Sequence, residues 1–167
     1  ETARLCKALG MKTIGVDAQR VNQPPWVDEL YISTDIDSVL GKGDFVIVTI
    51  PHTPQTEGLF SNEKFSLMKP TAIFVNVGRG KTTNLKDLAS ALLHGNLGGA
   101  GLDVFEIEPL PADHPIWKTP NTIITPHVAG AEGKHVDERR YSIVEENIER
   151  FVAGQTLRNL VDKSRWF

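Results

Sequence analysis

The sequence predicts an α/β fold, a doubly wound parallel sheet with helices on both faces. Short apolar segments of strand length alternate with helical segments along the chain, which is the order expected for strands joined by crossover helices. The apolar run at residues 45–50 is continuous rather than alternating, as in a parallel strand that is covered on both faces. In addition, polar side chains follow the ends of several predicted strands, and open parallel sheets bind their ligands at those ends.

The elements of the first half follow from apolar spacing and from Gly and Pro positions. They are a helix over residues 2–9 with Gly10 as its stop, a buried strand over 12–16 that ends at Asp17, a loop over 18–28 containing Pro24 and Pro25, a strand over 29–33, a helical turn over 37–40 and the strand over 45–50.

The second half continues the same alternation. Its predicted elements are a short helix over 62–68 with Ser61 or Asn62 as N-cap, a strand over 71–77 closed by Gly78-Arg79-Gly80, a helix over 85–94 with Asn84 as N-cap and Gly95 as stop, strands over 99–105 and 122–125, and an amphipathic helix over 135–152.

Composition excludes several classes of protein. A chain of 167 residues can form one domain with a substantial core. The net charge of −3 and the pI near 6.0 provide no basic surface for nucleic acid or an anionic membrane. No apolar run approaches the ~18 residues of a membrane-spanning helix. Cys6 is the only cysteine, so an internal disulfide and a thiolate metal cluster are both excluded. We expect no metal site and a cytoplasmic protein.

Chemically capable residues collect after the predicted strands. They are Asp17, the Pro51-His52-Thr53 segment, Asn76 with Arg79, Asp103 with Glu108, and His127. Taken singly, each has an ordinary structural explanation: a Gly-Arg-Gly turn is most often a surface turn, and a loop histidine is most often structural. Glu106 is an equally placed alternative to Glu108.

The combination of Arg79, Glu108 and His127 is more informative than its members. Reduction of a 2-keto acid needs a cation for the substrate carboxylate and an acid for the developing alkoxide. Arg79 can bind a carboxylate through two parallel hydrogen bonds, and histidine suits acid–base catalysis near neutral pH. A carboxylate such as Glu108 beside the imidazole fixes its tautomer and stabilises its protonated form.

The hydride must come from a cofactor, because no side chain can donate one. Asp17, at the end of an early strand, can accept hydrogen bonds from the ribose hydroxyls of NAD and would repel the 2′-phosphate of NADP. Arg20, three residues later, leaves room for NADP, and a turn or capping aspartate is the alternative for Asp17. We therefore expect NAD, with NADP as the second choice.

Five segments resemble the D-isomer-specific 2-hydroxyacid dehydrogenase family. The spacing also agrees, with 29 positions from Arg79 to Glu108 (108 − 79) and 19 from Glu108 to His127 (127 − 108). The resemblance extends over essentially the whole chain. The matching segments are residues 9–17, 51–56, 76–80, 101–109 and 125–130.

This resemblance implies a Rossmann-type domain that reduces small 2-keto acids, such as glyoxylate or hydroxypyruvate, in a homodimer. It implies that Arg79 binds the substrate carboxylate and carbonyl, that His127 is the acid/base and that Glu108 is its partner. It also implies cofactor contacts, with Asp103 near the nicotinamide carboxamide and His52 only as a neighbour in the cofactor loop. The implied cofactor-binding residues are Asp17, Pro51, His52, Thr56, Val77, Gly78, Arg79, Asp103, His127, Ala129 and Gly130.

The sequence departs from the family pattern in one respect. The Gly-rich phosphate loop, the strand before it and most of the substrate domain are not found in it. We expect a nucleotide-binding domain over residues 1–130, incomplete at its N-terminus, and a return helix with a C-terminal segment over residues 131–167. We further expect a natural protein that is longer at its N-terminus, and no activity from these 167 residues alone.

Three alternatives stay open at this point. The C-terminal-binding transcriptional corepressors share the fold and a similar Arg/Glu/His set, so an NAD-sensing binding protein is the first. An inactive truncated relative that serves as an interaction partner is the second. Formate dehydrogenases, which resemble this pattern with glutamine in place of Glu108, are the third.

Overall fold

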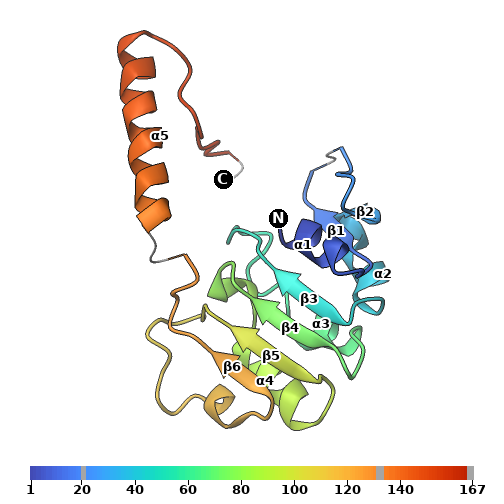
Figure 1. Ribbon diagram of the computed structural model, residues 1–167. Helices are drawn as coiled ribbons and strands as arrows, with labels where there is room; N and C mark the ends of the chain where they lie inside the picture. The colour runs from blue at the N-terminus through green and yellow to red at the C-terminus, as the bar shows by residue number, and fades with distance from the viewer. Residues whose placement is uncertain (20–21, 131–133, 165–167) are drawn as a thin grey trace.

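The computed structural model describes residues 1–19, 22–130 and 134–164, and its strands form two parallel sheets (Figure 1). The smaller sheet pairs β1 (Ile14–Asp17) with β2 (Glu29–Ile32). The larger sheet has the order β3-β4-β5-β6, and every neighbouring pair in it is parallel. Its strands are β3 (Phe45–Val48), β4 (Ile73–Asn76), β5 (Gly99–Leu102) and β6 (Thr122–Ile124). The predicted α/β class with a parallel sheet is confirmed.

The predicted helices are also present, with small differences at their ends. The structure adds three short 3₁₀ helices that the periodicity of the sequence did not indicate: η1 (Ser33–Asp35), η2 (Gly80–Thr82) and η3 (Pro115–Lys118). The α-helices are α1 (Thr2–Ala8), α2 (Ile36–Leu40), α3 (Asn62–Ser66), α4 (Leu85–Leu93) and α5 (Lys134–Val152).

Helix α4 shows both predicted end signals. The Asn84 side chain accepts hydrogen bonds from the amides of Lys86 and Asp87, each at 3.1 Å, and so caps the N-terminus. Gly95 follows the helix at a φ of 72°, a left-handed conformation that is least costly for glycine. The predicted N-cap and stop are therefore confirmed, and α4 has a defined position behind the sheet.

Alternate residues of β3 and β4 divide the large sheet into two different faces. Val48 and Phe74 point toward α3 and α4, where they join the buried core with side chains such as Leu88. Figure 1 shows α3 and α4 on this one side of β3–β6. The core therefore lies between the sheet and these two helices.

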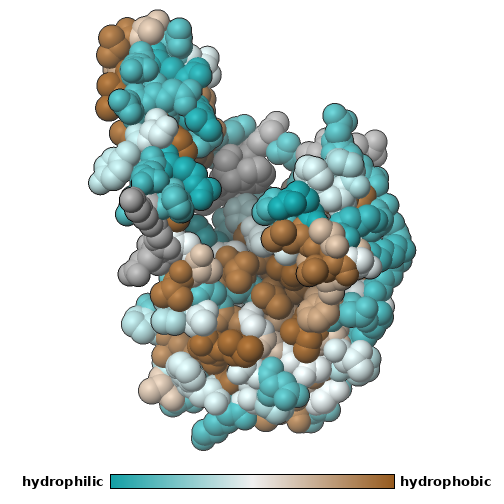
Figure 2. Space-filling model, viewed as in Figure 1, coloured by the Kyte–Doolittle hydropathy of each residue, from teal (hydrophilic) through white to brown (hydrophobic). Residues whose placement is uncertain are grey.

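The opposite face of the same sheet carries apolar side chains that no described helix covers. Phe45 and Ile47 of β3 and Ile123 of β6 are exposed, with Ile123 at 72%. Figure 2 shows apolar surface gathered over the strands on this side. We call these three residues the bare face. A doubly wound sheet carries helices on both faces, and here the described helices α3 and α4 lie on one of them.

The two sheets are separate from each other in the described residues. In the described residues, β1 pairs with β2 and β3 pairs with β4, but β1 and β3 do not pair with each other. A doubly wound sheet without one central strand would divide at this point. The division agrees with the expected absence of the first strand and its Gly-rich loop.

Helix α5 stands away from both sheets in Figure 1. Several of its apolar side chains are exposed, among them Tyr141 at 75% and Ile148 at 61%. No helix in the described ranges is both long enough and apolar enough to cross a membrane. Residues 131–133 lie outside the described residues, so the domain boundary at residue 130 stays a prediction.

Candidate active site

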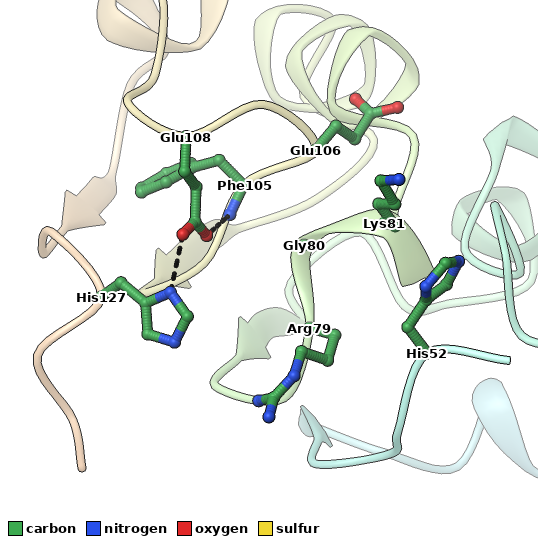
Figure 3. A pocket seen from close by; sticks show the side chains of 8 residues that line it. All are labelled: His52, Arg79, Gly80, Lys81, Phe105, Glu106, Glu108 and His127. Atoms are coloured by element: carbon green, nitrogen blue, oxygen red, sulfur yellow. Dashed lines mark hydrogen bonds and ion pairs between the residues drawn. The ribbon is translucent and has the colours of Figure 1, made fainter. Parts of the chain in front are cut away.

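Arg79, Glu108 and His127, which come from three different loops, line one pocket of about 270 Å³ (Figure 3). Each loop follows the carboxyl end of a strand of the large sheet: β4, β5 and β6 in that order. Parallel strands bring these ends to a common edge, which is why residues 48 positions apart in the sequence (127 − 79) meet here. The remaining lining residues are His52, Gly80, Lys81, Phe105 and Glu106.

His127 and Glu108 form a direct pair. His127 Nδ1 lies 2.7 Å from Glu108 Oε2, and the backbone amide of Phe105 donates to Glu108 Oε1 at 2.9 Å. Both carboxylate oxygens therefore have partners. Burial acts to raise the pKa of Glu108, but the hydrogen bonds from His127 and Phe105 outweigh it, so the pKa lies below its usual value. The carboxylate is thus kept charged beside the imidazole.

A second carboxylate, Asp103, holds the loop that carries His127. Its Oδ1 accepts from Thr125 Oγ1 at 2.6 Å and from the Val128 amide at 2.9 Å, and its Oδ2 accepts from the Ala129 amide at 2.9 Å. Burial works against its ionisation, but these hydrogen bonds prevail and the pKa of Asp103 is lowered. Between these anchors His127 has a φ of 55°, which non-glycine residues seldom adopt. The predicted contact of Asp103 with the nicotinamide carboxamide stays a prediction.

The Arg79 guanidinium is exposed, and Nη1 donates to the Gly78 carbonyl at 2.8 Å. This is its one hydrogen bond within the part of the chain that the structure describes. Guanidinium has five N–H donors, so most of them are available for a carboxylate. Figure 3 shows the Arg79 guanidinium and the His127 imidazole on either side of the pocket. An acid bound by Arg79 would therefore lie beside His127.

Glu106 and Glu108 have different tasks, although both line the pocket. Glu106 Oε2 accepts from the Leu85 amide at 2.8 Å and so satisfies the first turn of α4. Its role is structural, and Glu108 alone reaches His127. Lys81 was not among the residues predicted from the sequence, although its position directly after Gly-Arg-Gly was the available signal. In Figure 3 its side chain extends away from the Arg79 guanidinium.

His52 lies on the Pro51–Thr56 loop and lines the pocket. Its Nε2 is 3.5 Å from Glu57 Oε2 and has no hydrogen-bond partner among the described residues. Thr56 Oγ1 closes the loop by donating to the Pro51 carbonyl at 2.8 Å and accepting from the Thr53 amide at 2.8 Å. The loop therefore presents a defined backbone beside the end of β3.

The predicted cofactor residues extend beyond the pocket along the carboxyl edge of the strands. Asp17 ends β1, in the smaller sheet, and its exposed side chain accepts from the Gln19 amide at 2.8 Å. Val77 and Gly78 follow β4, and a Cβ on Gly130 would meet open space. Such an extended edge fits a dinucleotide, whose two halves bind across a crevice of this kind. Arg20 lies outside the described residues. The described residues hold no cluster that could ligate a metal ion.

Comparisons with known proteins agree with this geometry. Residues 1–129 match the family described as D-isomer specific 2-hydroxyacid dehydrogenase, NAD binding domain. The chain is 42% identical over 130 residues to a glyoxylate/hydroxypyruvate reductase B of Escherichia fergusonii, covering 78% of this chain and 38% of that protein. It is 36% identical over 162 residues to a glyoxylate reductase of Korarchaeum cryptofilum, covering 96% and 48%.

Solved structures show the same fold. An NADPH-dependent glyoxylate/hydroxypyruvate reductase from Sinorhizobium meliloti, in complex with NADP and sulfate, matches with a TM-score of 0.89 at 35% identity, covering 99% of this chain and 52% of that one. A probable 2-hydroxyacid dehydrogenase from Rhizobium etli, in complex with NADP, matches with a TM-score of 0.85 at 34% identity, covering 96% and 51%. The chain thus spans about half the length, or less, of these relatives.

Proposed function

This chain belongs to the D-isomer specific 2-hydroxyacid dehydrogenase family, and we propose that the full-length protein reduces small 2-keto acids with a nicotinamide dinucleotide. One observation carries the proposal: His127 and Glu108, paired at 2.7 Å, share a pocket with Arg79. Glyoxylate and hydroxypyruvate are the proposed substrates because the relatives named above are reductases of these acids. The D configuration of the 2-hydroxy product is part of the proposal.

Arg79, His127 and Glu108 have different roles in the proposed reduction. A nicotinamide dinucleotide, when bound, would supply the hydride for the carbonyl carbon. Arg79 binds the substrate carboxylate by paired hydrogen bonds and so orients the carbonyl toward His127. His127 donates a proton from Nε2 to the carbonyl oxygen as negative charge develops there, since Nδ1 is held by Glu108. Glu108 stabilises the protonated imidazole, and the product is the 2-hydroxy acid.

NADP is at least as well supported as NAD for this protein. The charge of Asp17 favours NAD, because its carboxylate would repel the 2′-phosphate of NADP. Against this, three of the similar solved structures contain NADP or NADPH. We therefore propose an NAD(P)H-dependent enzyme. The preference for NAD that Asp17 alone suggests is accordingly weakened.

The test is a turnover assay on the full-length protein. Glyoxylate, hydroxypyruvate and pyruvate are each offered with NADH and with NADPH, and oxidation of the nucleotide is followed at 340 nm, its usual absorbance band. We expect turnover by the unmutated protein. His127→Ala should mainly lower kcat, and Arg79→Ala should mainly raise the KM of the keto acid. If the protein binds the nucleotide but oxidises it with none of these keto acids, the proposed reductase activity is refuted and the NAD-sensing binding protein is favoured.

The same assay tests the partial chain. We propose that residues 1–167 alone do not turn over, because the phosphate-binding backbone and one wall of the cleft would lie elsewhere in the full-length protein. Turnover by the 167 residues at the rate of the full-length protein would overturn this. The homodimer and the cytoplasmic location stay predictions.

A further inference from the structure

Asn76 is the last residue of β4 and is completely buried. The proposed chemistry gives it no task, and a buried amide side chain is costly unless its donors and its acceptor are satisfied. All four of its side-chain hydrogen bonds go to residues 78–83, the segment that contains Arg79. They are from the Gly78 amide to Oδ1 at 3.0 Å, and from Nδ2 to the Arg79 carbonyl at 3.2 Å, to Thr82 Oγ1 at 3.2 Å and to Thr83 Oγ1 at 2.9 Å.

These contacts hold the main chain on both sides of Arg79. The Gly78 amide, before Arg79, and the Arg79 carbonyl are both hydrogen-bonded to Asn76. Thr82 Oγ1 also donates to the Arg79 carbonyl, at 2.7 Å. From the other direction, Gly80 packs against the backbone of Phe105. A Cβ on Gly80 would lie 1.9 Å from the Phe105 carbonyl oxygen, so no side chain fits there.

The Arg79 side chain itself has little that restrains it. Its guanidinium is exposed, and the bond to the Gly78 carbonyl joins it only to the neighbouring residue. The direction in which Arg79 leaves the loop therefore depends on its main chain. Asn76 holds that main chain on both sides, because its amide accepts from the Gly78 amide and donates to the Arg79 carbonyl from one buried position.

We propose that Asn76 is a positioning residue for Arg79: it sets the loop so that the guanidinium faces the carboxylate of a 2-keto acid. The inference rests on the proposed function for the identity of that ligand. Asn76 does not touch the substrate. A small misplacement of a binding group can cost about 100-fold in rate, so the effect of losing Asn76 is measurable.

The experiment uses the full-length protein with Asn76→Asp, which keeps the shape and the Oδ1 acceptor but loses the donors of Nδ2. We expect the KM for glyoxylate to rise about 10- to 100-fold, with a smaller change in the Kd of the dinucleotide. Asn84→Ala is the matched control, because it removes two hydrogen bonds of another asparagine, at the first turn of α4 and outside the pocket. It should lower the melting temperature and leave the KM unchanged.

A double-mutant cycle separates positioning from general stability. If Asn76 acts through Arg79, then Asn76→Asp added to Arg79→Ala raises the KM no further. If the rise in KM in the double variant equals the product of the rises in the two single variants, the inference is overturned. An unchanged KM in Asn76→Asp alone would also overturn it. Should Asn76→Asp fail to fold, Thr82→Val and Thr83→Val replace it. Thr82→Val, which removes the bond to the Arg79 carbonyl, must then raise the KM more than Thr83→Val does.

A binding measurement keeps this inference distinct from the proposed function. Oxalate, a dicarboxylate that mimics a small 2-keto acid, is titrated into the protein saturated with dinucleotide. An unmutated protein that binds oxalate but turns over no keto acid would refute the reductase, and weaker oxalate binding by Asn76→Asp would still support the positioning role. Equal oxalate binding by Asn76→Asp and the unmutated protein would refute the positioning role whatever the turnover.

Discussion

Glu108→Gln tests whether the carboxylate beside His127 keeps the imidazole ready to donate a proton. Glu108 uses both carboxylate oxygens as acceptors, one for the Phe105 amide at 2.9 Å and one for His127 Nδ1 at 2.7 Å. Glutamine has one oxygen and an NH₂ group. If the glutamine oxygen accepts from the Phe105 amide, its NH₂ group faces His127 Nδ1 and can bond only to an unprotonated Nδ1. If the oxygen faces Nδ1 instead, the bond to the Phe105 amide is lost. The negative charge is lost in both orientations.

The size of the effect follows from the exposure of the pair. Two unit charges 4 Å apart attract by about 1 kcal/mol in water and about 4 kcal/mol at an effective dielectric constant of 20. The side chains of His127 and Glu108 are 47% and 36% exposed, so solvent screening places the pair in the lower part of that range. At about 1.4 kcal/mol per factor of ten in rate, the loss corresponds to a fall of about 10- to 100-fold.

The assay is kcat/KM for glyoxylate reduction by the full-length protein at neutral pH. Without the carboxylate the protonated imidazole loses its partner charge, and we expect kcat/KM to fall about 10- to 100-fold. Glu106→Gln is the matched control, since Glu106 bonds to Leu85 and not to His127. An unchanged kcat/KM in Glu108→Gln would refute the role assigned to the pair.

Three further predictions concern other parts of the fold. Gly80→Ala should destabilise the protein by at least about 1–3 kcal/mol in urea unfolding, because its Cβ would lie 1.9 Å from the Phe105 carbonyl oxygen, whereas Gly101→Ala, whose Cβ has no neighbour nearer than 3.7 Å, should cost less; equal costs would contradict the close packing. Asp17→Ala should shift the kcat/KM ratio toward NADPH by about tenfold or more, and an unchanged ratio would remove Asp17 from the ribose site. The pKa of Asp103 is lowered in the folded protein, so its contribution to stability is present above the unfolded value of 3.8 and is lost as pH falls through the lower folded value; urea midpoints of Asp103→Asn should therefore vary less with pH below about 4 than those of the unmutated protein.

The sequence predicts the strands and helices of this fold because both carry strong apolar periodicity. Its predicted strands are too long at their carboxyl ends: residues 45–50, 71–77 and 99–105 pair only as far as Val48, Asn76 and Leu102. Apart from Asp103, the residues that follow are apolar or small, and periodicity cannot distinguish them from strand. In the structure they leave the sheet and form the loops of the candidate site.

The candidate site shows the same limit. A polar residue after each strand was sufficient to bring Arg79, Glu108 and His127 together as candidates. The choice of Glu108 over Glu106 depends on loop conformation, since the two carboxylates are only two residues apart and point to different partners. The hydrogen bonds of Asn76 depend on residues 78–83 folding back over the end of β4, which no local pattern indicates.

The bare face has a consequence for this chain in solution. Phe45 and Ile47 present apolar surface next to the edge of β3 that no described strand pairs with, and Ile123 presents apolar surface on β6 at the other edge of the sheet. Contiguous apolar surface and open strand edges are the two features that lead folded domains to aggregate. The 167 residues produced alone therefore have both exposed apolar surface and an open strand edge to which another strand can pair. Their solubility would depend on how fast a covering segment or a second molecule reaches that side of the sheet.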